Sequence, residues 1–135
     1  MEKTDHELET IRLKKASDLV NQPTMPTSIV KLHTYGDFEK LLAQYPDKVI
    51  LIDFTAVWCG PCRFYGPIFE KVQSEYSNEF IFAKVDVDEN RQVAMKYQIS
   101  GVPTTLFIKN GKVFEQAVGA VSYETLKDYL ESLKA

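Results

Sequence analysis

The stretch that decides the fold is residues 49–62, which read Val-Ile-Leu-Ile-Asp-Phe-Thr-Ala-Val-Trp-Cys-Gly-Pro-Cys. Its first half is almost wholly apolar and rich in β-branched side chains, a pattern that is typical of a strand buried on both faces. From Gly60 to about Ser77, apolar residues recur at three- and four-residue intervals, as on one face of a helix. The residues on that predicted face are Phe64, Ile68, Phe69, Val72 and Tyr76. The stretch therefore predicts a buried strand that passes directly into a helix.

Outward from this junction, the sequence predicts an alternation of strands and helices. We expect strands over 29–33, 48–56, 80–87, 103–109 and 112–118. We expect helices that open at Gly36-Asp37 and end at Pro46, that span 60–77 and 90–97, and that run from a Ser122 cap to Leu133. Asn110-Gly111, between the last two strands, is a strong signal for a two-residue hairpin. This order predicts an α/β fold with a mixed central β-sheet flanked by helices on both faces.

The composition excludes several classes of protein. The chain has 135 residues and a net charge of −3, which suits one domain and argues against the basic stripe of a nucleic-acid binder. The longest aliphatic run, 49–52, ends at Asp53 and is far shorter than the ~20 residues that cross a bilayer. Two cysteines are too few for a disulfide framework. We therefore expect partners that are neither nucleic acids nor membranes.

The first 27 residues differ in character from the rest of the chain. Residues 5–20 carry a narrow apolar stripe that predicts a weak helix, and Pro23 and Pro26 mark a linker after it. We therefore expect an N-terminal extension over 1–27 and a domain over 28–135. The segment is acidic and has no apolar run, so we expect neither a secretory signal nor a transit peptide, and we expect a cytoplasmic protein. A solvated extension and a docking helix both fit these residues.

Cys59 and Cys62 have the spacing of a redox pair. Cys59 lies at the predicted helix N-terminus, where unpaired N–H groups and the helix dipole favour a thiolate. Cys62 follows about one turn later, and Pro61 suits the first turn because its missing N–H has no partner to lose there. The alternatives are two inert thiols or half of a zinc site. A structural zinc needs four ligands and the chain has no second cysteine pair, so we expect no metal.

Around these cysteines, residues 54–67 resemble the active-site segment of the thioredoxin family. Further motifs follow in the family's order, namely Ile99-Ser100-Gly101-Val102-Pro103-Thr104, Lys109-Asn110-Gly111 and Val118-Gly119-Ala120. The resemblance covers about residues 28–135, and residues 1–27 have no counterpart in it. It implies the thioredoxin fold and a thiol-disulfide oxidoreductase that reduces protein disulfides.

The resemblance also implies a role for each cysteine. Cys59 would attack the disulfide of a substrate protein, and Cys62 would resolve the mixed disulfide. A thioredoxin reductase-type electron donor would reset the pair, so that the protein serves as a monomeric electron carrier in cell redox homeostasis with no cofactor beyond its own disulfide. Gly60-Pro61 goes with a reducing potential in the family. The alternatives are a disulfide isomerase or oxidase, and a non-catalytic binding module that docks through residues 1–27.

Asp53 is the next candidate for a catalytic role. It interrupts an apolar strand, so we expect its carboxyl group to be buried and its pKa to be raised toward neutrality. A group tuned in this way can take a proton from Cys62, through a water molecule, as that thiol becomes a nucleophile. Asp53 aligns with the family's buried aspartate, and Lys84 aligns with the lysine near it. The alternative is a hydrogen-bonded polar residue that only fixes the strand.

The remaining candidates belong to a substrate surface that the resemblance implies. It implies a cis peptide before Pro103, which would leave the Val102 backbone free to pair with an extended segment of the substrate. Gly119 aligns with a small residue at the rim of this surface, and we expect Trp58 to pack beside the disulfide. The predicted substrate-binding residues are Trp58, Gly60, Pro61, Val102, Pro103 and Gly119.

Several positions depart from the family's pattern. Thr55 stands where the family usually has a tryptophan or another aromatic residue, which removes packing against the active-site helix. Val57 replaces a commonly charged residue and makes the rim more apolar. Arg63 keeps the charge of the usual lysine, and Phe64-Tyr65 is bulkier than the usual pair. These changes bear on the reduction potential and on partner preference rather than on the chemistry.

Overall fold

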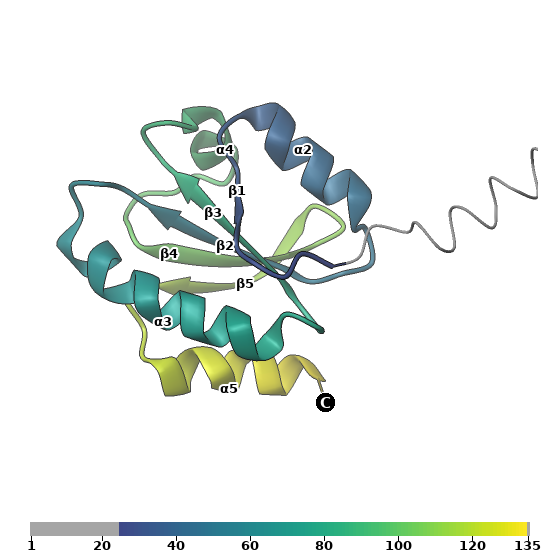
Figure 1. Cartoon of the computed structure of the whole chain (residues 1–135). Coiled ribbons are helices and arrows are strands. Elements are labelled where there is room, and N and C mark those ends of the chain that lie inside the picture. The colour runs from purple at the N-terminus through teal and green to yellow at the C-terminus, as the bar shows by residue number, and fades with distance from the viewer. Residues whose placement is uncertain (1–24, 135) are drawn as a thin grey trace, which may run out of the picture.

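The structure is a computed structural model that describes residues 25–134 (Figure 1). The predicted weak helix over 5–20 and most of the linker lie outside these residues. The strands are β1 (Val30–Lys31), β2 (Ile50–Thr55), β3 (Ile81–Asp86), β4 (Thr104–Lys109) and β5 (Lys112–Val118). The helices are α2 (Tyr35–Gln44), α3 (Gly60–Tyr76), α4 (Arg91–Lys96) and α5 (Tyr123–Lys134). Within the described residues, no helix is long and apolar enough to cross a membrane.

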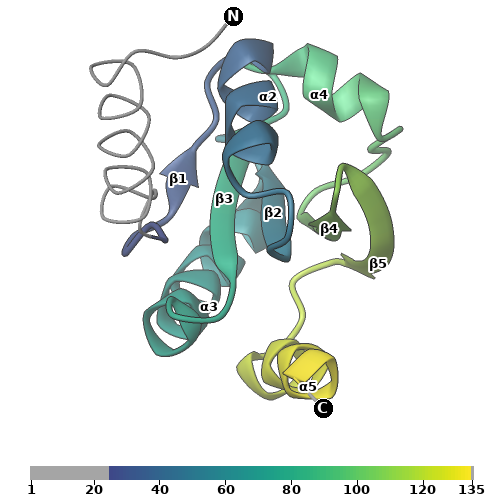
Figure 2. The ribbon, with the colours of Figure 1, turned by 90° about the vertical axis from the view of Figure 1, so that its right-hand side faces the viewer.

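The strands form one five-stranded mixed sheet in the order β1-β3-β2-β4-β5. β1, β3 and β2 run parallel to one another, whereas β4 is antiparallel to both β2 and β5. Figures 1 and 2 show α2 and α4 on one face of the sheet and α3 and α5 on the other. Each pair of helices closes its own cluster of buried apolar side chains against the sheet. The expected α/β architecture, with helices on both faces, is confirmed.

β2 is the central strand and places the site. Successive side chains of a strand point to opposite faces, so Ile50, Ile52 and Phe54 enter the cluster beneath α2 and α4, while Leu51 enters the cluster beneath α3 and α5. Asp53 follows Leu51 by two residues and therefore faces α3 as well. It is 1% exposed, although its side chain is polar. The strand thus carries a carboxyl group into the layer between the sheet and α3.

α3 begins directly at the cysteine motif, as predicted, but its buried face differs from the predicted one. The buried residues are Cys62, Tyr65, Phe69, Val72, Gln73 and Tyr76. Phe64, which we placed on the apolar face, is 70% exposed. That prediction is wrong because the stripe that contacts the sheet begins at Cys62 and continues at Tyr65, which turns Phe64 outward. The exposed ring adds apolar surface near the cysteines.

The other predicted elements are confirmed with small corrections. α2 begins one residue before the expected Gly36, because Thr34 and Asp37 form a reciprocal capping box that the sequence analysis missed. β1 is shorter than the predicted strand over 29–33, since it lies at the sheet edge and pairs with β3 alone. Positive φ angles at Asn110 (55°) and Gly111 (75°) confirm the two-residue hairpin. Ser122 caps α5, because its Oγ accepts the Thr125 N–H at 3.1 Å.

Candidate active site

Cys59 and Cys62 are joined in a disulfide at the N-terminus of α3. Cys59 is the N-cap residue, and its Sγ accepts a hydrogen bond from the Cys62 N–H at 3.2 Å. A reduced Cys59 would keep this donor and the positive end of the helix dipole, both of which stabilise a thiolate. Both cysteines are nearly buried, at 4% and 6% exposure, while Gly60 and Pro61 between them are exposed. The pair therefore sits just beneath a small exposed turn.

The peptide bond between Val102 and Pro103 is cis, as the resemblance implied. The Cys59 Sγ lies 3.6 Å from the Val102 carbonyl oxygen, so this loop is in contact with the disulfide. Gly119 donates its N–H to the Pro103 carbonyl oxygen at 2.8 Å and has a φ of 92°. The structure thus brings Cys59, Val102, Pro103 and Gly119 together from three separate segments.

Trp58 lies at the surface, where it lines one hollow with Val102. Its side chain is 67% exposed, and its indole N–H donates to Oδ2 of Asp88 at 2.7 Å. Asp88 was not among the predicted site residues, and its only signal in the sequence is the acidic turn that follows the third strand. Trp58 forms one wall of a hollow of about 140 Å³ whose other lining residues are Val87, Ile99, Ser100, Gly101 and Val102. The indole is therefore held at the rim of the Val102 loop.

Asp53 is buried with an incomplete set of partners. No donor among the described residues reaches its Oδ1. Its neighbours in the sheet are Lys84 on β3 and Thr105 on β4. Burial raises the pKa of Asp53 to about 7, and the charge of Lys84 offsets part of that rise. The expected burial and raised pKa are confirmed.

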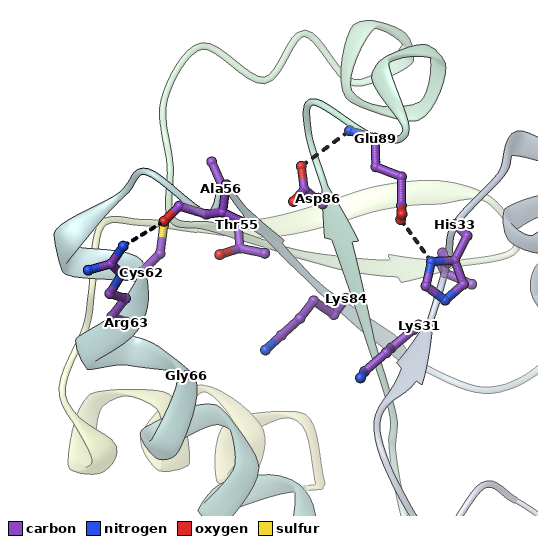
Figure 3. A pocket seen from close by; sticks show the side chains of 12 residues that line it. Lys31, His33, Thr55, Ala56, Cys62, Arg63, Gly66, Lys84, Asp86 and Glu89 are labelled. Carbon is purple, nitrogen blue, oxygen red and sulfur yellow. Dashed lines mark hydrogen bonds and ion pairs between the residues drawn. The ribbon is translucent and has the colours of Figure 1, made fainter.

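A cavity of about 530 Å³ opens between the first turns of α3 and strands β1 and β3 (Figure 3). Lys31 and Lys84 extend into it from neighbouring strands, and Cys62 lines it from the helix side. The remaining lining residues are Leu32, His33, Thr55, Ala56, Val57, Arg63, Gly66, Asp86 and Glu89. The half-buried Thr55 leaves this space open because its side chain is small. The cavity therefore lies against Cys62.

Two hydroxyl groups close the other side of Asp53. The Tyr65 hydroxyl and the Thr105 Oγ1 are 2.8 Å apart and hydrogen-bonded, and both side chains are 0% exposed. Neither residue was among the predicted site residues, and Tyr65 stood out in the sequence only for its bulk. The signal that could have found the pair is a polar residue on the sheet-facing stripe of α3 together with a threonine inside an apolar strand.

The profile of the thioredoxin family, described as "Thioredoxin", matches residues 29–132. The chain belongs to the thioredoxin family. It is 40% identical over 100 residues to Thioredoxin-1 of Caenorhabditis elegans, covering 74% of this chain and 86% of that one. It is 36% identical over 115 residues to the mitochondrial thioredoxin of Mus musculus, covering 82% and 69% of the two chains. The crystal structure of Schistosoma mansoni thioredoxin superposes with a TM-score of 0.72 at 40% identity, covering 78% of this chain and 95% of that one.

Family membership and the disulfide-bonded pair together establish the activity. This member of the family is a thiol-disulfide oxidoreductase, and its reaction is the reduction of protein disulfides. Its redox group is its own pair of cysteines, which pass between dithiol and disulfide. Within residues 25–134, no group of three or more His, Cys, Asp or Glu side chains is arranged to hold a metal ion.

Proposed function

We propose that Cys59 is the attacking thiolate and Cys62 the resolving thiol of a two-electron cycle. The Cys59 sulfur attacks one sulfur of the substrate disulfide, forms a mixed disulfide and expels the other substrate sulfur as a thiolate, which takes a proton. Cys62 then loses its proton, attacks the Cys59 Sγ and releases the second substrate sulfur. The substrate gains two electrons and two protons, and the pair is oxidised.

The observation that carries this assignment is the different surroundings of the two sulfurs. The Cys59 Sγ accepts the Cys62 N–H at the helix N-terminus and lies 3.6 Å from the carbonyl oxygen of the half-buried Val102. Cys62 instead lines the inner cavity together with Lys84. A substrate that docks on the Val102 loop therefore meets Cys59 first. Cys62 acts second, on a sulfur that is already attached to the protein.

Asp53 fits the role of proton acceptor from Cys62, and Lys84 fits the role of its charge partner. A carboxyl group whose pKa is about 7 exchanges a proton readily at neutral pH. Its register partner Lys84 shares one cavity with Cys62, which offers a place for a bridging water molecule. If Asp53→Asn left the resolution step by Cys62 undiminished across neutral pH, this role would be wrong.

Substrate binding is assigned to the rim around the disulfide. The Val102 backbone can pair with an extended substrate segment, because the half-buried loop lies beside the Cys59 sulfur. Main-chain pairing of this kind selects little by sequence, which suits a reductase of many proteins. The side walls would come from the exposed Trp58, Gly60 and Pro61 and the half-buried Gly119, with Pro103 fixing the loop beneath them.

We further propose that this protein is a cytoplasmic, monomeric electron carrier that a thioredoxin reductase-type enzyme resets. Membership of the thioredoxin family supports a reductase donor in general. A matched relative is mitochondrial, so cell fractionation is the measurement that decides the compartment.

The reduction potential of the Cys59–Cys62 pair is the first test. Titration against a dithiol buffer can be followed by the fluorescence of Trp58, the one tryptophan in the sequence. For a two-electron couple, ~30 mV changes the equilibrium about tenfold. A potential well below the glutathione poise supports a reductase, and a potential above it supports an oxidase or isomerase. Failure to detect reversible pairing would instead favour a binding module.

Trapping of mixed disulfides tests the order of the two cysteines. In Cys62→Ser, Cys59 can attack a substrate but nothing resolves the product, so substrate proteins should accumulate on the variant. Cys59→Ser is the matched control and should trap far less, because its remaining sulfur faces the inner cavity. Equal trapping by the two variants would contradict the assignment.

A further inference from the structure

A row of polar side chains crosses the sheet beneath α3. In the register of the sheet, Asp53 pairs with Lys84 on β3 and with Thr105 on β4. Lys84 pairs in turn with Lys31 on β1. Register partners in adjacent strands point to the same face, so this row lies in the layer that α3 covers. Tyr65 of α3 joins the row through its hydrogen bond to Thr105.

The hydroxyl pair has one proton more than its own hydrogen bond uses. Tyr65 and Thr105 carry one O–H each, and their mutual bond at 2.8 Å uses one of these protons. Within the described residues, no acceptor is bound to the other proton. Asp53 presents the complementary shortage, because its buried Oδ1 has no donor in that same part of the chain. The hydroxyl pair thus has an unused donor and Asp53 an unused acceptor, and both lie in the layer between the sheet and α3.

The register places these two groups within reach of each other. Side chains directly opposite on antiparallel strands have Cβ atoms about 4.5–5.5 Å apart, and Thr105 is directly opposite Asp53. The two groups are not hydrogen-bonded in the disulfide form that the structure shows, so their contact requires the carboxyl group or the threonine side chain to turn. Tyr65 is hydrogen-bonded to Thr105, which gives the connected order Tyr65, Thr105, Asp53.

We propose that Tyr65 and Thr105 are positioning residues for the proton-transfer step, because their hydroxyl pair serves as the reversible hydrogen-bond partner of the Asp53 carboxyl. When Asp53 is ionised, Tyr65 donates to Thr105 and Thr105 donates to the carboxylate. When Asp53 has taken the proton of Cys62, its carboxyl O–H donates to the threonine oxygen and the pair reverses. The hydroxyl protons only reorient, so the one proton that is transferred passes from Cys62 to Asp53. The inference rests on the role proposed above for Asp53.

Charged and titratable groups around Asp53 act together with this pair. Those in the same row or lining the adjoining cavity are Lys84 and Asp86 of β3, Lys31 of β1, Cys62, Arg63 and Tyr65 of α3, and the paired His33 and Glu89 of the loops that follow β1 and β3. Burial raises the pKa of Tyr65, so its phenol stays neutral at working pH and can act only as a hydrogen-bonding group. Lys84 supplies charge from one side of Asp53, and the hydroxyl pair supplies a donor from the other.

The test is the pKa of Asp53 in two variants of the full-length reduced protein, read from its carboxyl carbon by NMR. Thr105→Val keeps the shape and removes the donor, so the pKa of Asp53 should rise by about one unit. Tyr65→Phe removes only the group that polarises Thr105, so the rise should be smaller. The pKa of Asp53 in the double variant should equal that in Thr105→Val alone, because Tyr65 acts through Thr105. Thr105→Ser, which keeps the hydroxyl, should restore the wild-type value.

A matched control and a second readout separate this inference from a structural role. Tyr76→Phe removes another nearly buried phenol of α3, bonded to Glu131, and should leave the pKa of Asp53 unchanged. An unchanged pKa in both Thr105→Val and Tyr65→Phe would overturn the proposal. If Thr105→Val does not fold, Tyr65→Phe carries the test, since it removes a single oxygen atom.

The pH profile of the resolution step distinguishes this inference from the proposed function. If both hold, the midpoint for release of substrate by Cys62 rises in Thr105→Val together with the pKa of Asp53, and Thr105→Val has no such effect in an Asp53→Asn background. If the pKa of Asp53 rises while the profile does not move, the hydroxyl pair still partners Asp53, and the catalytic role of Asp53 fails instead.

Discussion

Asp53 and Lys84 are register partners on neighbouring parallel strands, with both side chains in the layer beneath α3. The carboxyl group is 1% exposed, and the lysine is half-buried at the edge of the cavity that Cys62 also lines. Burial and the lysine charge act on the carboxyl group in opposite senses, and burial dominates, so the pKa of Asp53 is raised to about 7. A charge that the fold disfavours is thereby kept near the cysteine pair.

Burial of the Asp53 carboxyl group should lower the free energy of unfolding as pH rises above the acidic range. The pKa of Asp53 is about 7 in the folded chain against an ordinary value of 3.8, so between these values the folded state binds more protons than the unfolded state. Stability is therefore full near pH 4, falls as pH rises toward 7, and stays low above it. The difference corresponds to about 4 kcal/mol at most. Asp53→Asn should be more stable than wild type by a large part of this amount at pH 8.

Chemical denaturation at pH 4 and pH 8 checks this prediction. At pH 4 the wild-type carboxyl group is mostly protonated, so the two proteins should have similar free energies of unfolding. At pH 8 the free energy of unfolding of Asp53→Asn should exceed that of the wild type. A gain of equal size at both pH values would point to packing rather than to ionisation.

Lys84→Met should raise the pKa of Asp53 further, because it removes the opposite charge from the adjacent strand. We expect a rise of about one unit and a matching upward movement of the pH midpoint for resolution by Cys62. Lys31→Met is the matched control, since Lys31 stands one strand further along the same row and should have a smaller effect. NMR titration of Asp53 in both variants measures the difference, and equal effects would refute the specific role of Lys84.

Features that depend on local chemistry were predictable from the sequence, and features that depend on register were not. Asn110-Gly111 determines a hairpin through its own backbone, and Cys59 and Cys62 determine a redox pair through their place at the start of a helix. The Tyr65–Thr105 bond joins residues 40 apart and exists only once α3 is seated on β4. The Trp58–Asp88 bond likewise spans 30 residues.

The outward position of Phe64 has the same origin. Phe64 and Tyr65 are both aromatic, and periodicity alone allows either of them to begin the buried stripe. The choice is made by packing against the sheet, where Tyr65 is buried and hydrogen-bonded to Thr105 while Phe64 faces outward. The sequence therefore predicts the helix and the cysteine chemistry, whereas the side chains that surround Asp53 require the three-dimensional arrangement.

Asp88 should affect substrate binding through Trp58. The indole donates to Oδ2 of Asp88, which holds an otherwise exposed side chain at the rim of the Val102 loop. Asp88→Ala frees the ring, so KM for a protein disulfide should rise about two- to fivefold with little change in kcat. The fluorescence anisotropy of Trp58 should fall as well. Glu89→Ala, in the same turn but paired with His33, is the control that should leave both quantities unchanged.

Removal of residues 1–24 tests the proposed division of the chain. The buried clusters on both faces of the sheet are formed by residues between 32 and 130, so the free energy of unfolding should change by less than about 1 kcal/mol. The reduction potential should be unchanged. Turnover with a reductase is the third measurement. A fall in turnover at unchanged potential would assign the extension to donor docking, and a loss of stability would contradict an independent domain over 28–135.

Gly119→Ala should be costly for a reason that the nearby Gly101→Ala does not share. Gly119 has a φ of 92°, a conformation that side-chain-bearing residues adopt only under strain, while its N–H holds the Pro103 carbonyl oxygen at 2.8 Å. Space is open around both glycines, so crowding does not separate them. We expect Gly119→Ala to lose about 1–2 kcal/mol of stability and to raise KM by disturbing the loop, with Gly101→Ala close to wild type. Denaturant unfolding of the two variants, together with their KM values, measures the contrast, and equal losses would mean that the backbone of Gly119 has no special part in holding the Val102–Pro103 loop.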